Sequence, residues 1–165
     1  MRMFLLLPAL IFGCKSASVS VSGKVSGEGL SATSAYWGGP YIVITDAQFD
    51  CIDMPWVLED YDDDDVNEVS TDDSFKALQF TYESSKVESG KLSISSRESP
   101  AFAWFLQVQD GEASANQATS GTIELEIDKK DWAEGNFELT FGDDGTLSGD
   151  FVIENCTNLK QRKYE

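Results

Sequence analysis

Residues 120–156, SGTIELEIDKKDWAEGNFELTFGDDGTLSGDFVIENC, carry the clearest structural signal in the chain. Apolar and polar side chains alternate along residues 122–127 and again along 136–141. A period of two is typical of β-strands that bury one face. The turn sequence Gly142-Asp143-Asp144-Gly145 then precedes a returning apolar pattern over residues 147–153. This order predicts a β-hairpin near the C-terminal end of the fold.

Shorter runs of the same kind occur earlier in the chain. The continuous apolar run at residues 41–45, YIVIT, predicts a strand that is buried on both faces. Residues 30–37 are ambiguous, and the small, polar residues 110–120 predict a loop. No window shows a convincing helical period. Further strands are expected within residues 19–25, 75–82, 91–95 and 102–108.

The spacing of these runs indicates the fold class. Short strands separated by turn residues predict an all-β protein, a single antiparallel β-sandwich or barrel of about eight to ten strands. The chain has 165 residues, of which 41% are hydrophobic, so it can bury a real core. We expect one domain over residues 19–157 and a polar tail over 158–165.

The first fourteen residues, MRMFLLLPALIFGC, have the layout of an export signal. Arg2 precedes an apolar run over residues 3–12, and the small residue Gly13 follows it. A basic start, a short apolar centre and a small residue at the end are typical of cleaved signal peptides. The apolar run is too short to cross a ~30 Å hydrocarbon core as a permanent helix.

The segment Ile11-Phe12-Gly13-Cys14 resembles the lipobox of bacterial lipoprotein precursors. Ile11, Gly13 and Cys14 match that pattern, while Phe12 is bulkier than the usual residue. The resemblance implies that residues 1–13 are a signal peptide and that Cys14 carries a diacylglycerol and an acylated amine, with chains such as palmitate. Residues 14–18 would then be a lipidated tether. The alternative is an ordinary signal peptide in which Cys14 is incidental.

The resemblance also implies a location. A lipidated Cys14 would anchor the protein in the cell envelope by several acyl chains. Lys15 stands where many inner-membrane lipoproteins of enteric bacteria have an aspartate. This favours the outer membrane of a Gram-negative bacterium. The strand pattern from Ser120 to Cys156 is also similar to that of uncharacterised β-rich lipoproteins of Gram-negative bacteria, which implies a fold and no activity.

The chain contains three cysteines. If Cys14 takes the lipid, Cys51 and Cys156 remain as an even pair in an oxidising compartment. We therefore expect a Cys51–Cys156 disulfide. The alternative is a pair of free, buried thiols.

Charge and composition narrow the function classes. A net charge of −17 repels nucleic acids and anionic surfaces and attracts cations and basic partners. It also favours a soluble monomer. The chain has no histidine, so Ser-His-Asp and Cys-His catalytic arrangements are excluded. We expect a protein that is not an enzyme and does not bind nucleic acid.

Acidic residues concentrate in residues 59–73. The spacing within this run begins like a calcium-binding loop, but Asp65 stands at the sixth position and Thr71 at the twelfth, where an EF-hand has glycine and glutamate. The run is therefore either a non-EF-hand calcium site or a solvated, self-repelling loop. Ca²⁺ is the one cofactor that the sequence suggests. Its candidate ligands are Asp60, Asp62, Asp64, Asp65 and Glu68.

Two tryptophans are candidates for binding a partner. Trp56 lies beside the acidic run and Trp132 lies in a polar turn, whereas Trp104 lies in an alternating strand and is expected in the core. Exposed aromatic rings on a β-sandwich can stack on sugars or peptides. The partner, a protein or a glycan, is not specified by the sequence.

Together these features predict a lipid-anchored envelope protein with a non-catalytic binding or structural role. One alternative is a calcium-stabilised adhesion or binding module that uses residues 59–73. Another is a carrier of small apolar ligands in the barrel interior.

Overall fold

The computed structural model describes residues 16–49, 51, 74–84, 86–109, 112–128 and 131–156. These residues form ten strands and one short 3-10 turn, Gly142–Asp144, which confirms the predicted all-β fold and strand number. The strands are β1 (Ser18–Val25), β2 (Ser34–Gly38), β3 (Tyr41–Thr45), β4 (Phe75–Tyr82), β5 (Gly90–Ser95), β6 (Ala101–Gln109), β7 (Glu112–Gln117), β8 (Ser120–Asp128), β9 (Trp132–Thr140) and β10 (Gly145–Asn155).

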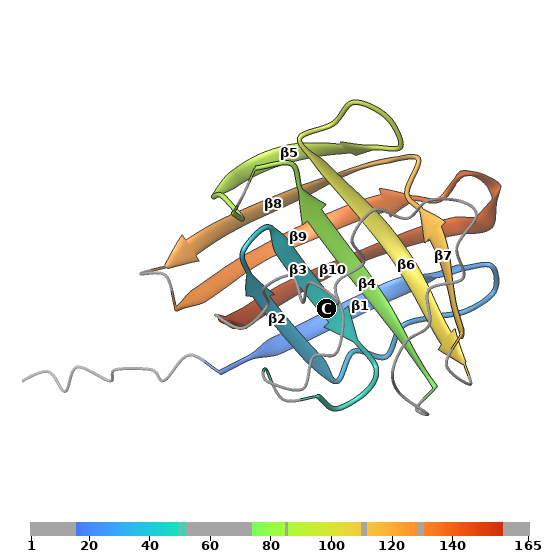
Figure 1. The fold of residues 1–165 in the computed structure, drawn as a ribbon, viewed down its shortest axis with the longest axis horizontal. Coiled ribbons are helices and arrows are strands. Elements are labelled where there is room, and N and C mark those ends of the chain that lie inside the picture. Colours follow the sequence, from blue (N-terminus) through green and yellow to red (C-terminus); the bar gives the residue numbers. More distant parts are fainter. Residues whose placement is uncertain are drawn as a thin grey trace, which may run out of the picture.

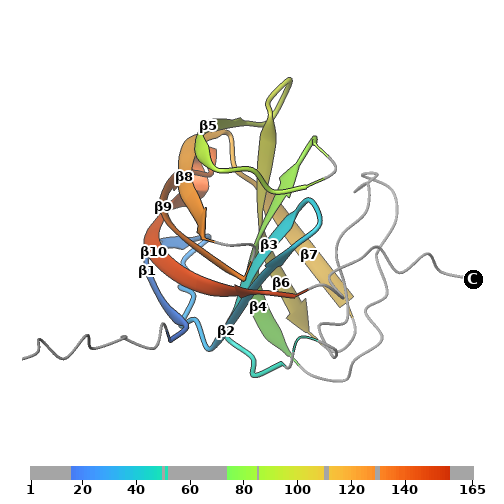
Figure 2. The same cartoon turned by 90° about the vertical axis from the view of Figure 1, so that its left-hand side faces the viewer.

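Eight of the strands close into a barrel in the order β10-β2-β3-β4-β6-β5-β8-β9. The other two strands are not part of this closed ring. β1 pairs with β10, and β7 pairs with β6. Two layers are visible in Figure 1, and Figure 2 shows them from the side. The first sheet contains β5, β8, β9, β10 and β1, and the second contains β2, β3, β4, β6 and β7.

The two sheets join through two short junctions that are parallel. Within each sheet all neighbouring strands are antiparallel, as predicted. At one corner Glu154 and Asn155 of β10 pair in parallel with β2. At the other corner a single pair, Ile94 with Ala101, joins β5 to β6. The fold therefore combines the two predicted architectures, a sandwich of two sheets that closes as a barrel.

Aromatic side chains from both sheets meet in the barrel interior. The ring of Phe80 in β4 packs edge-on against Phe137 in β9 with centroids 5.4 Å apart. Phe105 in β6 packs in the same way against Phe141 at 6.4 Å. Burying a side chain of this size stabilises a fold by about 1.5–3 kcal/mol. These contacts hold the two sheets together across the interior.

A second apolar cluster lies on the outward side of the second sheet. It includes Val43, Leu106 and Val108, all buried. The alternation of β3 therefore places Ile42 and Ile44 in the interior and Val43 in this second cluster, so the predicted burial on both faces is confirmed. Half-buried Trp104, expected in the core, packs against this outward core cluster.

The predicted disulfide is present in the second cluster. Cys51 and Cys156 are bonded, with their Cα atoms 5.6 Å apart although they are 105 positions apart in sequence. The amide of Cys156 also donates a hydrogen bond to the carbonyl of Trp37 at 2.6 Å. The bond and the hydrogen bond both lie at the corner where β10 meets β2.

The prediction of a loop over residues 110–120 is wrong, because β7 occupies most of it. Its small, polar residues have low strand propensity. The strand forms because its backbone pairs with the edge of β6, for example Ala115 opposite Leu106. Asn116 then donates hydrogen bonds to Ser26 Oγ and Asp144 Oδ2, both at 3.2 Å. Tertiary contacts outweigh local propensity here.

Candidate binding face

Most of the predicted site residues lie outside the described part of the chain. This is true of the lipidation candidate Cys14, of Trp56 and of the calcium-ligand candidates Asp60, Asp62, Asp64, Asp65 and Glu68. The structure describes Cys51, Cys156 and Trp132. The two cysteines form the structural disulfide. Trp132 begins β9 and is half-buried on the outward side of the first sheet.

Few polar side chains are buried among those that the structure describes. They are those of Thr45, Gln79 and Ser99, so no carboxylate among the side chains with a described exposure is buried. The hydroxyl of Tyr82 and the indole nitrogen of Trp37 are buried without a hydrogen-bond partner. Burial raises the pKa of the Tyr82 hydroxyl, so this group stays neutral at physiological pH.

The outward side of the first sheet is a polar surface built by strand alternation. Every second residue of β8, β9 and β10 points outward, and antiparallel pairing aligns them in rows across the strands. One row contains Thr122, Glu138 and Ser148. We call this surface the acidic face. Its carboxylates are Glu124, Glu126, Asp128, Glu134, Glu138, Asp150 and Glu154.

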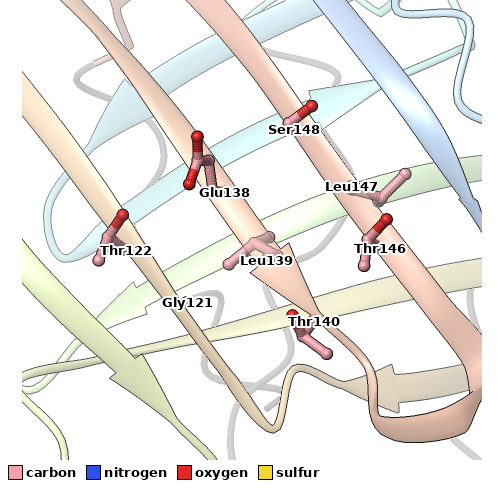
Figure 3. Close-up of a pocket in the computed structure, with 8 residues that line it drawn as sticks. All are labelled: Gly121, Thr122, Glu138, Leu139, Thr140, Thr146, Leu147 and Ser148. Carbon is pink, nitrogen blue, oxygen red and sulfur yellow. The ribbon is translucent and has the colours of Figure 1, made fainter.

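A shallow groove of about 470 Å³ lies within the acidic face. Figure 3 shows side chains of three neighbouring strands around it, with Thr122, Glu138 and Ser148 in one diagonal row. Thr140 and Thr146 form a second row. The groove therefore offers hydroxyl groups as donors and acceptors and one carboxylate. Its remaining lining residues are Gly121, Leu139 and Leu147.

The pairing of β8 with β9 places like charges next to each other. Glu126 lies directly opposite Glu134, and both are exposed. Side chains directly opposite in an antiparallel pair are about 4.5–5.5 Å apart at Cβ, where like charges destabilise the sheet. The pair therefore adds to the negative charge of this surface.

Trp132 lies among acidic side chains on the same face. The register places it between Asp128 of β8 and Glu154 of β10. The prediction that this residue lies near the surface is consistent with its half-buried position. An aromatic ring flanked by carboxylates can contact a cation through its π face while the carboxylates neutralise the charge.

Among the described residues of the acidic face, the lysines lie on its two edge strands. Lys91 lies on β5, where its Nζ is 3.8 Å from Oε2 of Glu124. Lys24 lies on β1, the opposite edge strand. In the described part of the sheet, the three central strands carry carboxylates and hydroxyls without a lysine or arginine between them.

The alternation of residues 122–127 and 136–141 already indicated which side chains point away from the core. It did not reveal the acidic face, because that surface depends on the register between strands. The turn at residues 128–132 has no Asn-Gly or Asp-Gly pair to fix the register of β8 against β9. The flanking strands β5 and β1 join the sheet through contacts that are distant in sequence.

Comparison with protein-family models, with curated proteins and with solved structures finds no match for this chain. Among the described residues, no helix is long and apolar enough to cross a membrane.

Proposed function

We propose that this chain is a lipid-anchored protein of the cell envelope with a non-catalytic binding or structural role. The Cys51–Cys156 disulfide carries the proposal. Structural disulfides persist mainly in oxidising compartments, which exported proteins reach. With these two cysteines bonded to each other, Cys14 is the third cysteine and stands at the end of the signal-like segment.

The distance between Cys14 and the fold suits an anchor close to the membrane. β1 begins at Ser18, four positions after the lipidation candidate Cys14. Four residues reach at most about 14 Å when fully extended. Acylation at Cys14 would hold the barrel near the bilayer surface, and Lys15 favours the outer membrane of a Gram-negative bacterium as that surface.

The non-catalytic part of the proposal is supported by the chemistry of the side chains. The chain has no histidine, and no carboxylate with a described exposure is buried. Burial and nearby charges usually raise the pKa of a carboxyl group enough for it to act as a general acid or base near neutral pH. The described surface is better suited to binding.

The two alternatives have less support. A calcium-stabilised module depends on residues 59–73, which lie outside the described part of the chain. A carrier depends on free volume in the barrel interior, whose described walls meet at Phe80 and Phe137 with centroids 5.4 Å apart.

Metabolic labelling tests the anchor. The full chain is expressed in a Gram-negative bacterium with labelled palmitate, and membranes are partitioned between detergent and water. We expect label and detergent partitioning in the wild type and neither in Cys14→Ser. The control, Cys51→Ser with Cys156→Ser, replaces the other two cysteines and should keep the label. Label that persists in Cys14→Ser, or is missing from the wild type, would overturn the proposal.

A further inference from the structure

We propose that the outer edge of β1 pairs with the same edge of a second copy of this chain, so that two barrels join through an antiparallel β1–β1 contact. The pairing rests on the proposed lipid anchor and deepens the proposed structural role, because it makes the chain self-associate at the membrane surface. Net charge alone favours a monomer.

β1 is the last strand of the first sheet, and its outer edge presents backbone groups to solvent (Figure 1). The backbone N–H and C=O of Val25 both bond to Glu28 at 2.9 Å, so they point away from β10. Backbone groups alternate between the two edges of a strand, so those of Val19, Val21 and Gly23 point the same way. Within the described part of the chain, no strand pairs with this edge. Such a row of N–H and C=O groups is a template for another strand.

This edge lacks the features that usually prevent pairing with another chain. β1 contains no proline and no acidic residue, and its register with β10 is continuous from Ser18 to Val25 without a bulge. Its one charged residue, Lys24, is exposed near the end of the strand. Natural edge strands are commonly blocked by proline, by bulges or by charges that point inward. β1 is therefore open to pairing over most of its length.

The symmetry of the outer edge favours a second copy as the partner. The available groups belong to Val19, Val21 and Gly23 and are centred on Val21, because Val25 is already bonded to Glu28. A two-fold axis at Val21 would place this residue opposite itself and Val19 opposite Gly23. Each copy then contributes the same patch, as an isologous contact requires. Val21 is half-buried against the core cluster, and the same residue of the second copy would cover it further.

The outer face of β1 is compatible with a second acidic chain. In this register exposed Ser20 lies opposite Ser22 of the second copy, and Lys24 lies opposite Ser18, at the border of the second copy's acidic face. The one carboxylate of β10 that pairs with β1 is Asp150, which lies beside Ser20. The Asp150 side chains of the two copies would be three strand spacings apart, roughly 14 Å. Repulsion over this distance is largely screened, since the Debye length is about 8 Å at 0.15 M ionic strength.

The proposed anchor adds to this contact. β1 begins four positions after Cys14, so both copies would be held with their first strands near one bilayer surface. In the paired strands the two Ser18 residues would be six positions apart along the strand axis, roughly 20 Å. Confinement to one surface raises the effective concentration of the two copies, so a short contact is sufficient.

Cysteine cross-linking in intact cells tests the pairing. The full chain with Val21→Cys is expressed in a Gram-negative bacterium, the cells are treated with a mild oxidant, and the protein is run on a non-reducing gel. Cα atoms of a directly opposite, hydrogen-bonded pair are about 5.5 Å apart, within reach of a disulfide. The matched control is Val19→Cys, since both valines are half-buried on the same face of β1. In the proposed register its two cysteines would be roughly 13 Å apart along the strand, which a disulfide cannot span.

We expect the covalent dimer of Val21→Cys to be at least about fivefold more abundant than that of Val19→Cys, and the wild type to form none. Adding Val19→Pro to Val21→Cys removes an outward N–H and should reduce the cross-link. Three results would each overturn the inference: equal yields from the two cysteine variants, which would mean random collision, absence of the Val21→Cys dimer, or a cross-link to a protein of different mass.

Palmitate labelling of the same cells separates these outcomes from failure of the anchor, because both cysteine variants keep Cys14. Label without the Val21→Cys dimer would leave the anchor in place and exclude the pairing. A dimer without label would support the pairing and exclude the anchor.

Discussion

Cys51 and Cys156 are 105 positions apart in sequence, and a disulfide holds their Cα atoms 5.6 Å apart. The bond joins the segment after β3 to the residue after β10. It lies at the corner where Glu154 and Asn155 form the short parallel junction with β2. The disulfide thus secures a barrel junction that has few backbone hydrogen bonds of its own.

Removing this bond should destabilise the fold strongly. We expect Cys51→Ala with Cys156→Ala to lower the free energy of unfolding by about 2–5 kcal/mol, because the unfolded chain regains the entropy of a long loop. Urea denaturation measures the change. Cys14→Ala is the control and should unfold as the wild type does. An unchanged unfolding midpoint in the double variant would contradict the structural role of the bond.

Gly149 is required for close packing in the first sheet. A Cβ at this position would lie 2.9 Å from Cζ of Phe137 and would also meet the carbonyl of Ser20. We expect Gly149→Ala to cost about 1–3 kcal/mol of stability through overpacking. Gly29→Ala is the control, because its new Cβ would lie at an ordinary contact distance of 3.5 Å from Gly23 O. The thermal midpoint of this variant should change much less than that of Gly149→Ala. Equal midpoints for the two variants would argue against this packing.

Phe137 is buried and packs against Phe80 of the opposite sheet, and its removal should leave a cavity. We expect Phe137→Ala to cost about 3–5 kcal/mol, since the rigid sheets collapse only partly around the missing ring. Val152→Ala removes a half-buried side chain from the outward side of the neighbouring strand and should stay within about 1 kcal/mol of the wild type. If Phe137→Ala lowered the free energy of unfolding no more than Val152→Ala does, the packing of Phe137 between the two sheets would be contradicted.

Glu28 and Lys76 form an ion pair with Oε2 and Nζ 2.8 Å apart. The hydrogen bond and charge of Lys76 lower the pKa of Glu28 below its ordinary 4.5, and Glu28 in turn raises the pKa of Lys76 above 10.5. Because the pKa of Glu28 is lower in the folded state, its ionised form stabilises the fold above pH 4.5. This contribution disappears as the pH falls through the folded-state pKa of Glu28. Because the pKa of Lys76 is higher in the folded state, its protonated form stabilises the fold below pH 10.5. This contribution disappears as the pH rises through the folded-state pKa of Lys76.

Thermal midpoints across pH check this pair. Wild type should melt slightly above Glu28→Gln at neutral pH, and the difference should shrink in acid and again in strong alkali. The difference should be small, because the pair is solvent-exposed. A constant difference across the whole range would exclude the ion pair as its cause.

The sequence predicts some parts of this structure well for local reasons. The β9–β10 hairpin follows from alternation on both sides of Gly142–Gly145, and the structure pairs Leu139 with Leu147 accordingly. The disulfide follows from counting cysteines once Cys14 is set aside. Both predictions depend on neighbouring residues or on simple chemistry, and both are confirmed.

Other parts depend on contacts that are distant in sequence. β7 exists because the edge of β6 was available for pairing, although its own residues favour a loop. The parallel junctions of β10 with β2 and of β5 with β6 form only where the two sheets meet at a corner, which no local pattern indicates. The acidic face depends on register, since the placement of Glu126 opposite Glu134 changes if β8 shifts by one pair. Alternation reveals which residues point outward, but register decides which of them are neighbours.

The intact mass of the wild-type protein, extracted from bacterial membranes, tests the central claim most directly. We predict the mass of residues 14–165 with one disulfide, plus a thioether-linked diacylglycerol and an amide-linked acyl chain on Cys14. The mass of a chain that begins elsewhere, or of the chain from Cys14 onward without lipid, would contradict the proposal that this protein is a lipid-anchored component of the cell envelope.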